Sequence, residues 1–101
     1  MEISSVYYSN GSHEDFKILY NNNKHILVKN LSTKSDNKYS FGLREDLYSF
    51  YGFPVNQSCL TKKEVIKTLN RFIEINKQYT NNKNEIKMYK DMIKNAKKEC
   101  D

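Results

Sequence analysis

Five lysines near the end of the chain are spaced so that a helix would place them on one side. They lie four, three, four and three residues apart, and residues at these spacings are neighbours on an α-helix. We call this set the lysine face, and it consists of Lys83, Lys87, Lys90, Lys94 and Lys97. A row of ammonium groups attracts phosphates and carboxylates, so it predicts contact with a nucleic acid or with an acidic protein surface. Lys67 and Arg71, four residues apart, are further candidates for this contact.

The abundance of lysine provides a competing explanation for this row. Lys, Asn, Ile and Tyr fill 44 of the 101 positions, a composition typical of AT-rich genomes, so the row is also consistent with a merely solvated helix face. The charge distribution favours a role in binding. Residues 61–101 hold eleven basic and six acidic residues, whereas residues 1–60 hold six of each. Because only two arginines are present, diffuse electrostatic contact is favoured over base-specific reading.

The remaining reactive residue types show no spacing that predicts catalysis or metal binding. The two histidines and two cysteines form no Cys-x-x-Cys or His-x-x-x-His pair, and the three glycines are isolated. Glu14 and Asp15 are adjacent and would point to opposite faces of a strand. A long-range dyad of Cys59 and His25 is the one enzymatic alternative. We therefore expect no enzymatic activity, no catalytic residues, no bound metal and no cofactor.

The first part of the chain predicts the sheet on which such a helix would be positioned. Apolar and aromatic residues recur in four short segments that are separated by turn signals such as Asn10-Gly11. The expected strands cover residues 3–9, 15–20, 25–31 and 38–43. The sequence therefore predicts an antiparallel meander of three to four strands within residues 1–43.

Helical periodicity follows the predicted sheet. A short helix is expected over residues 44–52, before the extended Phe53-Pro54 step. Thr61–Glu64 fits a capping box at the start of a helix over residues 61–79. Asn82–Glu85 fits the start of a second helix over residues 83–100, with one long bent helix as the alternative. Residues 1–101 are thus predicted to form a single α+β domain: a small N-terminal antiparallel sheet, a short helix and a C-terminal helical pair.

Apolar residues beside the lysine face form a seam along the last predicted helix. The seam consists of Ile86, Tyr89, Ile93 and Ala96. Its 3, 4, 3 spacing predicts burial on the sheet, or, alternatively, contact with a second copy of the chain in a homodimer.

Together these features predict a small non-catalytic binding protein, a regulator or inhibitor that acts through its basic C-terminal helices. Its partner would be a protein that handles nucleic acid. The alternatives are direct binding to nucleic acid and homo-oligomeric assembly. Small size and AT-rich composition also fit a phage or mobile-element protein that blocks a host system. The sequence has no signal peptide and no apolar run of membrane-spanning length, so we expect no membrane association and a cytoplasmic location with reduced cysteines.

Overall fold

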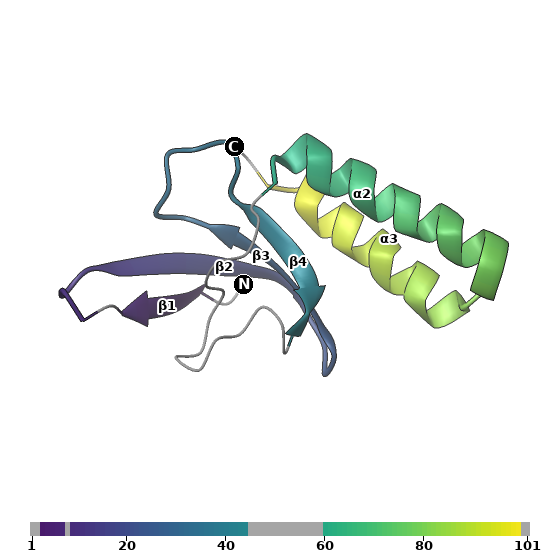
Figure 1. Ribbon diagram of the computed structural model, residues 1–101, viewed down its shortest axis with the longest axis horizontal. Helices are drawn as coiled ribbons and strands as arrows, with labels where there is room; N and C mark the ends of the chain where they lie inside the picture. Colours follow the sequence, from purple (N-terminus) through teal and green to yellow (C-terminus); the bar gives the residue numbers. More distant parts are fainter. Residues whose placement is uncertain (1–2, 8, 45–59, 100–101) are drawn as a thin grey trace.

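In the computed structural model, the chain folds into a four-stranded antiparallel sheet followed by two helices (Figure 1). The structure describes residues 3–7, 9–44 and 60–99. The α+β class, with the sheet first and the helical pair last, is confirmed. The two helices lie side by side and extend beyond the sheet (Figure 1). The short helix predicted over residues 44–52 lies outside the described residues apart from Arg44, and Cys59 and Cys100 lie outside them as well.

The sheet is a simple meander in which each strand pairs with the next along the chain. Its spatial order is β1-β2-β3-β4, and every pairing is antiparallel. The strands are β1 (Ile3–Tyr7), β2 (His13–Asn21), β3 (His25–Asn30) and β4 (Tyr39–Leu43). Short connections join consecutive strands, and short connections favour antiparallel pairing of neighbours along the chain.

A bulge in β2 determines which residues face the helices. Ile18 pairs with Val28, but Tyr20 pairs with Leu27, so Leu19 is an extra residue in the ladder. As a result Leu19 and Tyr20 both contact the main core, while Ile18 belongs to the opposite face of the sheet. The carbonyl oxygen of Leu19 accepts a hydrogen bond of 2.6 Å from the Asn95 side chain, which joins the bulge to the last helix.

Apolar side chains are buried on both faces of the sheet. On one face Leu27 and Tyr39 pack with residues of both helices, including Leu69 and Met92, and all four are fully buried. On the other face Phe16, Ile26 and Val28 form a smaller cluster. This explains the nearly continuous apolar run in β3, because neighbouring residues of a strand alternate between two covered faces.

The first helix, α2 (Lys62–Ile75), begins at the predicted capping box. The Thr61 hydroxyl accepts from the Glu64 backbone N–H, and the Glu64 carboxylate accepts from the Thr61 backbone N–H, each at 3.1 Å. These bonds satisfy two backbone donors that a helix start leaves open. The bonds from Thr61 also lower the pKa of the Glu64 carboxyl, because they favour its charged form.

A left-handed residue reverses the chain after α2. One π-helical turn, η1 (Asn76–Thr80), continues the helix, and Asn81 then adopts a φ of 48°. Asparagine tolerates this conformation better than most residues do. The Asn82 side chain accepts from the backbone N–H groups of Asn84 and Glu85, which starts α3 (Lys83–Lys97) as the sequence predicts. The chain therefore ends in a hairpin and not in one bent helix.

Candidate functional site

The lysine face lies on the exposed side of α3. All five of its side chains are exposed. Lys87 lies 3.5 Å from an Asp91 carboxylate oxygen, an exposed pair one helical turn apart. In the part of the chain that the structure describes, the other four ammonium groups have no ion-pair partner. The face therefore presents a row of mostly uncompensated positive charge.

The sequence of α3 positions this row by burying the opposite side of the helix. The side chains of Met88, Met92 and Ala96 lie in the main core, one turn apart on the side that faces away from the lysines. Glu85 lies in the first turn and Lys94 in the last turn, where the helix dipole favours an acid and a base. The helix is thus held in one rotation about its axis, and the lysine face must point to solvent.

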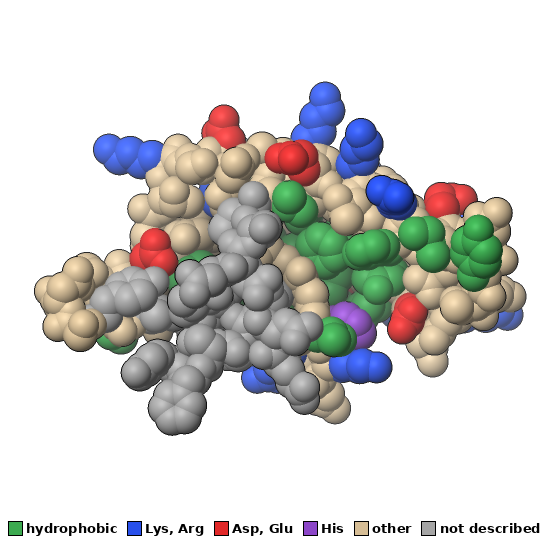
Figure 2. All heavy atoms as spheres, viewed as in Figure 1, with side chains coloured by type: hydrophobic (Ala, Val, Ile, Leu, Met, Phe, Trp, Pro, Cys, Tyr) green, Lys and Arg blue, Asp and Glu red, His purple; other side chains and the backbone are tan. Residues whose placement is uncertain are grey.

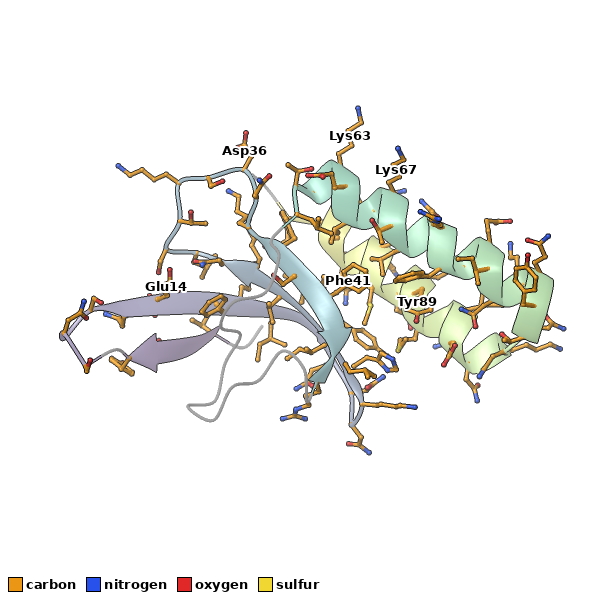
Figure 3. All side chains as sticks on the ribbon, viewed as in Figure 1. Glu14, Asp36, Phe41, Lys63, Lys67 and Tyr89 are labelled. Atoms are coloured by element: carbon orange, nitrogen blue, oxygen red, sulfur yellow. The ribbon has the colours of Figure 1, made fainter. Side chains whose placement is uncertain are left out.

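Lys67 and Arg71 are exposed on α2 and belong to a different surface. Together with Leu60, Phe72 and Ile75 they line a hollow of about 520 Å³, which we call the α2 groove. No residue of the lysine face lines it. In Figure 3, Lys67 points away from α2 on the outer side of the hairpin. The structure therefore places the predicted basic residues in two separate regions.

The predicted seam of α3 belongs to the chain's own core. Ile86, Ile93 and Ala96 are at most 9% exposed, and they join residues of α2 and of the sheet in one cluster. Tyr89 is partly buried, with its ring 5.7 Å from that of Phe72 on α2. These side chains fill the space between the two helices and the sheet, so the seam is not exposed for a second copy.

A buried carboxylate at the end of α3 was not predicted from the sequence. The Glu99 side chain is 6% exposed, and its Oε1 atom lies 3.0 Å from Lys17 Nζ and 3.6 Å from Lys29 Nζ. Both lysines belong to the helix-facing side of the sheet, and Lys29 Nζ also lies 5.8 Å from the centre of the Tyr39 ring. Charge pairs of this kind are strong where water is excluded.

The Lys62 ammonium joins the start of α2 to the same end of α3. It donates to the backbone carbonyl oxygen of Glu99, and it lies 3.4 Å from that of Lys97. Free carbonyls at a helix C-terminus carry partial negative charge, so an ammonium group is a favourable partner. The spacing of Met88, Met92 and Glu99 on one helical stripe is the sequence signal that could have identified Glu99 as facing inward.

A polar groove of about 460 Å³ lies between the β2–β3 turn and the start of α3. The partly buried His25 ring there lies 6.5 Å from that of Tyr89. Burial lowers the pKa of His25, as does the Lys24 charge, while Glu85 opposes them. Burial, with a smaller contribution from Glu85, raises the pKa of Tyr89.

The His25 imidazole is not hydrogen-bonded to another described side chain that could act with it. Within residues 3–7, 9–44 and 60–99, no hydrogen bond links it to a carboxylate or hydroxyl. Those same residues contain no group of three or more His, Cys, Asp or Glu side chains that could hold a metal ion. The arrangement is that of a polar surface hollow.

Comparisons with known proteins provide no relative for the chain. No protein-family model matches it, and none of the curated proteins or solved structures compared with it matches. Among the described residues, no helix combines the length and the apolar character needed to cross a membrane. The functional argument therefore depends on the geometry of the chain itself.

Proposed function

We propose that this chain is a non-catalytic binding protein, a regulator or inhibitor, and that the lysine face is its contact surface. The observation that supports this is the exposed row of five lysines, of which Lys87 has an acidic neighbour on α3. Like charges one turn apart destabilise a helix by about 0.2–0.5 kcal/mol per pair. A polyanionic partner would remove this repulsion.

The dimensions of the lysine face suit the phosphates of a nucleic acid. From Lys83 to Lys97 the helix rises about 21 Å, at roughly 1.5 Å per residue. One strand of B-form DNA carries about six phosphates over that length, since they are spaced by roughly 3.4 Å along the axis. Lysine carries a point charge on a flexible side chain, and it lacks the planar guanidinium with which arginine makes paired hydrogen bonds. Such contact would therefore depend little on base sequence. An acidic protein that itself handles nucleic acid offers the same charge pattern and is the other form of the proposal.

Binding to mixed-sequence single-stranded and duplex DNA and RNA, followed by fluorescence anisotropy at low salt, tests the direct form. The variant Lys87→Gln, Lys90→Gln, Lys94→Gln should bind at least about tenfold more weakly, because three phosphate contacts are lost. The matched control is Lys24→Gln, Lys34→Gln, Lys63→Gln, which removes three exposed lysines outside the lysine face. It has the same net charge as the first variant and should retain most of the affinity.

Two results would contradict the direct form. One is the absence of any binding by the wild-type chain at low salt. The other is an equal loss in both triple variants, which would show that net charge and not the lysine face is responsible. A pull-down from the native host with the wild-type chain and the first triple variant tests the protein form, which requires a partner that the variant fails to retain.

A further inference from the structure

We propose that two copies of this chain associate through α2, packed antiparallel about a two-fold axis at the α2 groove. The exposed apolar residues of the helical hairpin lie on this helix and its extension. Ile75 is 40% exposed and Tyr79 is 75% exposed, although both are large apolar side chains. Figure 2 shows hydrophobic side chains gathered along the hairpin, from the sheet to its far end. Clustered apolar exposure of this kind marks an interaction surface.

The α2 groove runs along α2 to its end. Its lining includes Leu60 before the helix, Thr68 and Phe72 within it, and Ile75 at its last residue. Tyr79 lies about one turn beyond Ile75 and is exposed. A two-fold axis across the helix brings the end of one copy onto the start of the other, so Tyr79 of each copy lies at the Leu60 end of its partner's groove. An isologous contact of this kind uses the same surface twice and closes as a dimer.

The charges along α2 match in the same arrangement. With the axis between residues 70 and 71, Lys67 of each copy lies opposite Glu74 of the other. Lys67 and Glu74 are seven residues apart and share one flank of the helix, so both copies form the pair. Arg71 falls beside the axis, where its guanidinium can contact the Phe72 ring of the other copy.

This charge pattern favours a second copy over an unrelated acidic segment. An acidic segment would pair with Lys67 and Arg71, but it would also place carboxylates against the exposed Glu64 and Glu74. Within one chain Glu74 has a weak exposed pair with Lys77 at 3.8 Å, which an intermolecular pair can replace. The alternation of acids and bases along the helix is self-complementary.

Sedimentation velocity of the full chain over a wide concentration range tests the dimer. The wild-type chain should show a reversible monomer–dimer equilibrium. Lys67→Glu or Glu74→Lys alone should raise the dimer dissociation constant by about tenfold or more, since two attractive pairs become repulsive. Combining both substitutions in one chain exchanges the two charges and should restore dimerisation. All of these residues are exposed good helix formers, and circular dichroism checks that the variants fold.

Mixing the two single variants gives a sharper result. The Lys67→Glu chain and the Glu74→Lys chain should form a heterodimer, because each pairs correctly with the other and not with itself. The control replaces the first variant by Lys94→Glu, which changes net charge equally but lies on the lysine face of α3. A mixture with this control should form far less heterodimer.

Monomeric wild-type chain at every concentration would overturn the proposal. So would a dimer that neither single substitution weakens, since it would use another surface. Neither outcome bears on the proposed role of the lysine face. That role is tested by polyanion binding, and the dimer is tested by the association state.

Discussion

Two groups of lysines in this small domain have opposite environments. At the C-terminal end of α3, Lys17 and Lys29 extend from the sheet to the buried Glu99 carboxylate. Along the outer side of the same helix, the lysine face is exposed, and among the described residues its ion-pair partner is the exposed carboxylate of Asp91. The same residue type thus holds the fold together in one region and remains available for a partner in the other.

Burial accounts for the difference between these two groups. Opposite charges attract more strongly where protein excludes water, and breaking such a pair leaves a charge that water cannot fully solvate. Exposed pairs contribute at most about 1 kcal/mol and are screened by salt. Substitutions at the Glu99 cluster should therefore affect stability, and substitutions on the lysine face should affect binding.

The largest effect on stability is expected from Glu99→Gln. This substitution removes the carboxylate between Lys17 and Lys29 while keeping the size of the side chain. We expect it to lower the free energy of unfolding by about 2–4 kcal/mol, because a partly buried charge pair is broken. Urea denaturation measures the change. Asp91→Asn, which breaks the exposed pair with Lys87, is the matched control and should cost less than about 0.5 kcal/mol. Equal losses in the two variants would remove the distinction between the two regions.

An intermediate effect is expected at the other end of α3. Asn82→Ala removes the side-chain oxygen that accepts from two backbone N–H groups, and it should lower the free energy of unfolding by about 1 kcal/mol. Asn84→Ala changes an exposed neighbour inside the helix and should be neutral or slightly stabilising. If Asn82→Ala costs more than Glu99→Gln in the same urea series, the Glu99 cluster is not the stronger attachment of α3.

A still smaller effect is expected on the lysine face itself. The variant Lys87→Gln, Lys90→Gln, Lys94→Gln loses one exposed ion pair and also several like-charge repulsions. Its free energy of unfolding should therefore stay within about 0.5 kcal/mol of the wild-type value. A large loss of stability in urea would show that these lysines have a structural role.

The smallest effect concerns pH. His25 has a lowered pKa in the folded chain, because burial and Lys24 disfavour its charged form. Its unfolded pKa is near 6.5, so the unfolded chain binds more protons just below that value. Stability should thus be full above pH 6.5 and should decline slightly as the pH falls through the folded pKa. His25→Asn should flatten this dependence in thermal unfolding between pH 7.5 and 5.5.

Local signals in the sequence predicted much of the fold. The sequence signals for the capping box at Thr61 and Glu64 and for the cap at Asn82 each span four residues. The structure confirms both. The strand segments and the lysine spacing are equally local. The β2 bulge was missed, since an extra residue in a ladder depends on how two strands pair.

Long-range contacts could not be predicted in the same way. Lys17 and Glu99 are 82 residues apart, and nothing in either segment specifies the other. The buried side of α3 is wider than the predicted seam. Met88 and Met92 form a second apolar stripe that also lies in the main core. That second stripe explains why the lysine face points away from the whole core. Within the helical hairpin, the large apolar residues that remain exposed are Ile75 and Tyr79, on α2 and its extension.

The salt dependence of nucleic-acid binding tests the central claim most directly. For each phosphate neutralised, the slope of log affinity against log salt falls by about 0.9 on duplex DNA. The wild-type chain should show a slope corresponding to several contacts, and the Lys87→Gln, Lys90→Gln, Lys94→Gln variant should show a slope smaller by about 2–3. The Lys24→Gln, Lys34→Gln, Lys63→Gln control should keep nearly the wild-type slope. Identical slopes for wild type and the lysine-face variant would contradict the account.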